Sequence, residues 1–137
     1  MDKKEIRLLL NDKKLKATQT RISLLSILHK KNSAVSYSSI QKSLKKTDRV
    51  TLYRTIQSLT ENGIIHKAFQ DKNEVYYAIC GTSCDENNHN HNHAHFKCIE
   101  CNTISCEDLV QPIKIQLADF NFHKISINIE GICKTCQ

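Results

Sequence analysis

Two Cys-x-x-Cys pairs in the carboxyl-terminal part constrain this chain more than any other feature. Cys98 and Cys101 form the first pair, and Cys133 and Cys136 form the second. Each pair presents two thiolates about a bond angle apart, so two pairs can complete a tetrahedral shell around Zn²⁺. Four thiolates leave no coordination position for a substrate, and the pairs therefore predict a structural zinc site. Two disulfides or free thiols are the alternative interpretation.

The surroundings of these cysteines favour metal over disulfides. No apolar run approaches the roughly 18 residues of a membrane helix, and residues 1–5 lack the apolar core of a signal peptide. We therefore expect a cytoplasmic protein with no membrane partner. In that reducing compartment, seven cysteines indicate metal binding or redox sensing.

Charge divides the chain into two unlike parts. Residues 1–79 carry 16 Lys and Arg against 7 Asp and Glu, a net charge of +9, whereas residues 80–137 carry 4 against 7, a net charge of −3. A basic part joined to an acidic, Cys- and His-rich part suggests a polyanion-binding domain fused to a metal-binding module. A lysine-rich surface that merely aids solubility would give the same charge.

The basic part contains four helical patterns and then two β-type runs. Apolar residues recur at helical spacing in segments 3–11, 22–31, 36–44 and 48–62. Asp48 or Thr47 can cap the fourth helix, and Gly63 stands where a left-handed residue would end it. The runs 64–69 and 75–79 flank a turn-prone segment and predict a β-hairpin. Helices followed by a hairpin predict a winged helix-turn-helix domain over residues 1–80.

The fourth helix is the predicted recognition helix. A rotation of about 100° per residue places Arg49, Tyr53 and Arg54 away from its apolar stripe, with Thr51 at the edge. Such side chains near a helix amino terminus suit contacts in the major groove of DNA. An ordinary solvated helix face is the alternative.

A polar linker separates this domain from the cysteine pairs. Residues 81–94 are rich in Asn and His and show no hydrophobic period, so they predict a hinge. Residues 95–137 predict a small α/β domain with strands at 96–99, 103–106 and 122–130 and a helix that begins near Pro112 and contains Ile113 and Leu117. The expected fold class is therefore α+β.

Four motifs in this order resemble the ferric uptake regulator family from about residue 15 onward. They are Leu15-Lys16-x-Thr18-x-x-Arg21, Thr51-Leu52-Tyr53-Arg54-Thr55, His93-x-His95-Phe96-x-Cys98-x-x-Cys101 and Gly131-x-Cys133-x-x-Cys136. The resemblance implies a homodimeric repressor, with a carboxyl-terminal dimerisation domain, that binds AT-rich inverted-repeat operators in double-stranded DNA when its sensing metal is bound. It also implies DNA contacts from the recognition helix and from a lysine arm. The predicted DNA-binding residues are Lys16, Arg21, Arg49, Thr51, Tyr53 and Arg54.

The resemblance further implies a regulatory metal site at the hinge. Its predicted ligands are His66, Cys80, His95 and Cys106, with His93 as the substitute for His95. Iron sensors of the family carry carboxylates near the positions of the two cysteines, whereas imidazole and thiolate ligands suit Zn²⁺. The pattern therefore resembles the zinc uptake regulator branch, although that branch often has glutamate where this chain has Cys106. Fe²⁺ and Mn²⁺ are the alternative metals, and buried, metal-free cysteines are the alternative structure.

These features predict a zinc-sensing repressor of metal-uptake genes, and an iron-responsive or peroxide-sensing repressor of the same family is the alternative. An enzyme is not expected, because the chain lacks the His-x-Glu and Pro-Cys-x-x-Cys pair of zinc deaminases. No small-molecule substrate is expected either.

Overall fold

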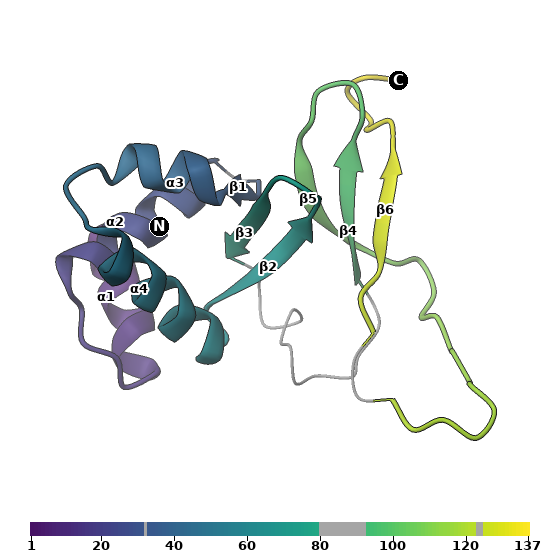
Figure 1. Ribbon diagram of the computed structural model, residues 1–137, viewed down its shortest axis with the longest axis horizontal. Coiled ribbons are helices and arrows are strands. Elements are labelled where there is room, and N and C mark those ends of the chain that lie inside the picture. Colours follow the sequence, from purple (N-terminus) through teal and green to yellow (C-terminus); the bar gives the residue numbers. More distant parts are fainter. Residues whose placement is uncertain (32, 80–92, 123–124) are drawn as a thin grey trace.

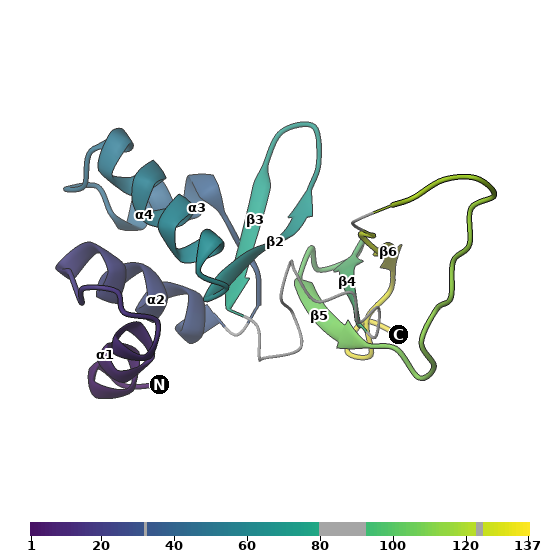
Figure 2. The ribbon, with the colours of Figure 1, turned by 90° about the horizontal axis from the view of Figure 1, so that it is seen from below.

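The computed structural model describes residues 1–31, 33–79, 93–122 and 125–137, with His93 described in its backbone only. Helices gather at the amino-terminal end, and a β-hairpin lies between them and a second sheet in both views (Figures 1 and 2). The elements in order are α1 (Lys3–Asp12), α2 (Gln19–Lys31), β1 (Val35–Ser36), α3 (Tyr37–Ser43), α4 (Arg49–Glu61), β2 (Ile65–Gln70), β3 (Val75–Ile79), β4 (His93–Cys98), β5 (Ile104–Asp108) and β6 (Asn128–Gly131). This arrangement confirms the predicted α+β fold class.

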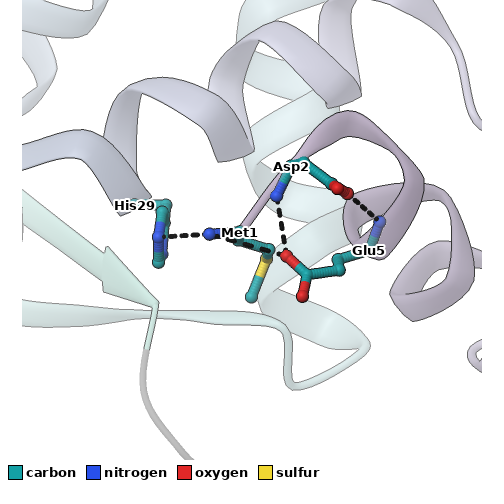
Figure 3. A network of polar contacts seen from close by, with 4 residues as sticks. All are labelled: Met1, Asp2, Glu5 and His29. Carbon is teal, nitrogen blue, oxygen red and sulfur yellow. Dashed lines mark hydrogen bonds and ion pairs between the residues drawn. The ribbon is translucent and has the colours of Figure 1, made fainter.

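Helix α1 begins at a capping box. The Asp2 carboxylate accepts a hydrogen bond from the Glu5 amide at 2.8 Å, and the Glu5 carboxylate accepts one from the Asp2 amide at 2.7 Å. These two bonds satisfy amide groups that have no partner within the helix. The Met1 amino group lies 2.6 Å from Nε2 of His29, which fastens the start of α1 to the end of α2 (Figure 3).

Helix α4 has the boundaries that its sequence predicts. The Asp48 carboxylate accepts a hydrogen bond from the Thr51 amide at 3.3 Å, so Asp48 is the amino-terminal cap. Beyond the carboxyl-terminal end, Gly63 has a φ of 69°, a left-handed conformation that residues with a Cβ atom rarely adopt. The chain turns sharply there and enters β2.

The core of the amino-terminal domain lies between the helices and the hairpin. Its members are fully or almost fully buried, and each leucine such as Leu52, at 0% exposure, contributes about 1.5–3 kcal/mol by leaving water. Strands β1, β3 and β2 form an antiparallel sheet in that order, with a bulge between Lys67 and Phe69. The helices, the hairpin and this core make a winged helix. Among the described residues, no helix has the length and apolar character that crossing a membrane requires.

The second sheet has the strand order β5-β4-β6. Strand β4 pairs antiparallel with β5, which sets His95 opposite Cys106, and parallel with β6, which sets Cys98 opposite Gly131. A Cβ atom added to Gly131 would meet the ring of Phe96 at 3.3 Å, so glycine permits the close approach of these strands. Strand β4 begins at His93, inside the segment predicted as linker.

The predicted helix near Pro112 is wrong. Residues 109–122 form no helix, and this segment extends away from β5 (Figures 1 and 2). Ile113 and Leu117, the expected buried positions, are 40% and 53% exposed. A short helix takes most of its stability from packing an apolar face, and no described part of the chain covers this one. The predicted strand 122–130 is likewise reduced to the exposed strand β6.

Candidate metal sites and nucleic-acid interface

Four cysteines from two distant parts of the chain converge at one end of the second sheet. Cys98 ends β4 and Cys101 lies in the turn that follows, whereas Cys133 and Cys136 follow β6. The Ile99 amide donates to the Gly131 carbonyl at 2.8 Å, which holds the two pairs side by side. The four sulfur atoms all lie within 4.8 Å of one another, and all four are free thiols.

The spacing of these sulfur atoms suits a tetrahedral cation. Four sulfur ligands at the usual Zn–S distance lie about 3.8 Å apart. Sγ of Cys101 and Sγ of Cys133 lie 3.9 Å apart, far beyond the roughly 2.05 Å of a disulfide bond. The donor set and its geometry therefore fit Zn²⁺, with no position left for another ligand.

The pKa values of cysteine thiols in this cluster also favour the binding of a cation. Hydrogen bonds from the backbone amides of Cys101 and Cys133 lower the pKa of Cys98 to about 6. The Thr103 hydroxyl lowers the pKa of Cys101. In contrast, the neighbouring thiols of Cys133 and Cys101 raise the pKa of Cys136 to about 12. The cluster thus stabilises some negative charge, but a full set of four thiolates requires a positive ion among them.

A second cluster joins the hairpin to the second sheet. His66 of β2 is 5% exposed, and its Nε2 lies 3.0 Å from Nε2 of His95 in β4. The two rings are stacked, with centroids 4.9 Å apart. Cys106 lies opposite His95 in β5, and the donor atoms of all three residues lie within 4.8 Å of one another.

This cluster can also hold a metal ion. Two imidazole ligands of a tetrahedral zinc lie about 3.3 Å apart, close to the observed separation of the two Nε2 atoms. Three of the five predicted regulatory ligands, His66, His95 and Cys106, are thus brought together. The predicted ligand Cys80 lies outside the described residues, and the side chain of His93 is not described. His89 and His91, which the sequence predicts as linker residues with weak zinc binding as the alternative, and Cys84, which has no predicted role, also lie outside the described residues.

The candidate DNA-binding residues lie mainly on one face of α4. Arg49, Thr51, Tyr53 and Arg54 are exposed, with Tyr53 at 62%, while Leu52 between them is buried. The predicted polar face of the recognition helix is therefore present and accessible. Lys16 is exposed in the connector between α1 and α2.

The side chain of Arg21, the sixth predicted DNA-binding residue, is held by hydrogen bonds within the protein. Its guanidinium donates to the Lys16 carbonyl at 2.8 Å and to the Ser58 hydroxyl at 3.2 Å. It therefore ties the connector that carries Lys16 to helix α4. The sequence did not indicate this role, because Ser58 lies 37 residues from Arg21 and no local pattern joins them.

A winged helix with a basic, exposed recognition helix, joined to a small sheet with two clusters of metal-binding side chains, defines a DNA-binding and metal-binding transcription regulator. The comparison with known protein families gives the same class of protein. The chain belongs to the ferric uptake regulator family, whose model matches residues 12–131. It is thus a metal-responsive transcription regulator and not an enzyme.

Individual relatives cover almost the whole chain. The ferric uptake regulation protein of Staphylococcus epidermidis is 30% identical over 134 residues, which span 93% of this chain and 91% of the relative. A zinc uptake regulator solved in complex with zinc and DNA has a similar fold, with a TM-score of 0.68, 18% identity and coverage of 98% of this chain and 91% of that one. The ferric uptake regulator of Francisella tularensis, solved with iron, gives a TM-score of 0.53, 22% identity and coverage of 89% and 94%.

Proposed function

We propose that this protein is a zinc-responsive repressor of metal-uptake genes, which binds an AT-rich inverted repeat as a homodimer in the cytoplasm. The convergence of His66, His95 and Cys106 carries this proposal. Two imidazoles and a thiolate form a donor set that suits Zn²⁺, whereas Fe²⁺ and Mn²⁺ prefer shells richer in oxygen. Cys80, which directly follows β3, is the proposed fourth ligand.

The position of this cluster suggests how zinc would act. His66 belongs to the winged helix, while His95 and Cys106 belong to the second sheet. One ion held by all three residues would fix the angle between the two domains. A homodimer then presents two recognition helices at a spacing that matches one operator. A nearly complete switch requires zinc to favour this arrangement by about 5.5 kcal/mol over the open one.

The four-cysteine cluster serves as the structural zinc site in this proposal. Its thiols join β4 to the segment after β6 and leave no open coordination position. Residues 110–122, which follow β5, are exposed and support a homodimer, because they include large apolar side chains that a second copy could cover. These side chains are Val110, Ile113, Ile115, Leu117, Phe120 and Phe122.

On the DNA side, we assign direct contacts to five residues. Tyr53 and Arg54 enter the major groove with Arg49 and Thr51 beside them, and Lys16 lies outside that groove. Their exposure on α4 and on the connector supports this assignment. Arg21 supports Lys16 through the hydrogen bond to its carbonyl group.

A titration of operator binding with different metals tests the proposal. Protein that carries one zinc per chain should bind a cognate operator duplex more tightly as further Zn²⁺ is added, and Cys106→Ser should require more zinc for the same effect. Cys106→Glu is the matched variant, because it restores a negatively charged ligand. The curated relative is named for ferric uptake, so Fe²⁺ is the competing metal. Activation of the parent by Fe²⁺ alone, or an unchanged zinc response in Cys106→Ser, would refute the zinc assignment.

A further inference from the structure

The winged helix and the second sheet meet along a seam, and the candidate regulatory site occupies only one end of it. On the sheet side, His95 lies opposite Cys106, and Lys97 lies opposite Ile104. Because side chains alternate along a strand, these four residues share one face. On the other side of the seam, β2 supplies His66 at the metal end. The rest of β2 and the hairpin turn, residues 68–71, lie toward the other end.

The second end of the seam holds an ion pair and a cation–π contact. Nζ of Lys97 lies 3.7 Å from Oδ2 of Asp71, which stands in the turn of the hairpin. The same ammonium group lies 5.3 Å from the centre of the Phe69 ring. The Lys97 side chain is 21% exposed and that of Asp71 is 34% exposed, so water screens their attraction only in part.

Apolar packing and a backbone hydrogen bond complete this end. Ala68, Phe69 and Ile104 form a small buried cluster that is separate from the core of the winged helix. The Ala34 amide donates to the Ile104 carbonyl at 2.8 Å, a bond that crosses from one domain to the other. None of these contacts uses a ligand of the candidate metal site.

We propose that Lys97, through Asp71 and Phe69, is a latch that keeps the two domains closed before the regulatory metal binds. This inference rests on the proposed regulatory site and adds a positioning role for a residue outside it. A metal ion binds with an apparent dissociation constant equal to the intrinsic constant divided by the fraction of closed molecules. The latch therefore sets the zinc concentration at which the regulator responds.

Electrostatics alone predicts the opposite effect, which makes the role testable. Lys97 lies two residues from His95, about 7 Å along the strand. A positive charge on the same face of the strand repels a bound cation, so removing it should tighten zinc binding if Lys97 acts only through its charge. If Lys97 closes the seam, removing it should weaken zinc binding.

Lys97→Met provides the test, because it keeps the aliphatic stem and loses the ion pair and the cation–π contact. In protein that carries one zinc per chain, hydrogen exchange of the Ala34 amide reports opening of the seam. We expect that exchange to rise, because loss of the two contacts shifts the closed-to-open ratio about three- to thirtyfold toward the open form. The Leu52 amide, bonded to the Asp48 carbonyl within the winged helix, should not change. The exposed Lys114 supplies the charge-matched control, Lys114→Met.

The same proteins are then titrated with Zn²⁺ against a competing chelator. Lys97→Met should bind the second zinc more weakly, and the loss of zinc affinity multiplied by the rise in exchange should equal the change in the closed-to-open ratio. Lys97→Arg should behave like the parent, and Asp71→Asn should show a smaller loss because the Phe69 contact remains. Unchanged Ala34 exchange, or equal or tighter zinc binding in Lys97→Met, would overturn the latch. A parent protein that binds no second zinc would instead refute the proposed regulatory site.

Discussion

Replacing Arg21 by methionine tests whether this arginine binds DNA itself or holds Lys16 in place. The variant keeps the aliphatic stem and removes two hydrogen bonds, one of 2.8 Å to the Lys16 carbonyl and one of 3.2 Å to the Ser58 hydroxyl. Hydrogen bonds from a charged donor are worth about 1.5–3 kcal/mol when buried. The first bond is exposed and the second is partly buried, so we expect a loss of about 1–3 kcal/mol in the free energy of unfolding.

The effect on DNA binding separates the two roles of Arg21. Each phosphate contact contributes about 0.9 to the slope of log Kobs against log salt concentration. If Arg21 acts through Lys16, then Arg21→Met and Lys16→Met should each reduce the magnitude of this slope by at most about 0.9 per bound chain. The double variant should then reduce it by no more than either single variant. If Arg21 contacts a phosphate itself, the double variant should reduce the magnitude of the slope by about 1.8 per bound chain.

Fluorescence anisotropy of a labelled operator duplex at several salt concentrations measures these slopes. The four proteins of the double-mutant cycle should be compared at a zinc concentration that saturates the parent. Arg7→Met, at an exposed position of α1, is the matched control for the loss of an arginine. Additive losses in the double variant would contradict the positioning role.

Three further outcomes follow from the structure. Cys133→Ser should release the structural zinc and abolish stable dimers, which zinc analysis and sedimentation would detect; a folded dimer with full zinc content would contradict this. Arg54→Ala should weaken operator binding by about 1–3 kcal/mol at fixed salt, and Tyr53→Phe should also weaken it; parental affinity in both would remove α4 from the interface. The hydrogen bonds from Thr51 lower the pKa of Asp48, so its cap stabilises α4 fully above the unfolded value of 3.8 and is lost as pH falls through the lower folded value. Asp48→Ser should keep the cap and reduce the dependence of unfolding on pH below about 4, and an acid denaturation curve identical to the parent's would contradict the assignment.

Much of the winged helix was predictable because its signals are local. Asp48 and Gly63 mark the ends of α4, and the structure has both in the expected conformations. The strands of the hairpin lie within one residue of their predicted bounds, since turn-prone residues separate two β-type runs. Helix ends and hairpin strands depend mainly on residues close together in the chain, so a short stretch of sequence is enough to predict them.

The remaining features depend on contacts between distant residues. The apolar spacing around Ile113 and Leu117 predicts a helix, but no described element packs on that face and none forms. The pairing of Lys97 with Asp71 joins two charged residues whose local sequences read as an ordinary strand and an ordinary turn. For the metal clusters, the ligand types and their spacing were readable, whereas the 3.0 Å approach of the two histidine rings required the folded hairpin.

Strand β4 carries residues of both candidate metal clusters, and we expect this to set an order of assembly. His95 and Cys98 are three positions apart, about 10 Å along the strand, and side chains an odd number of positions apart point to opposite faces. Strand β4 pairs Cys98 with Gly131 on one neighbour and His95 with Cys106 on the other. A slip of one residue would turn His95 away from the hairpin. We therefore expect a newly made protein to acquire the ion of its cysteine cluster before it can respond to a metal at His95.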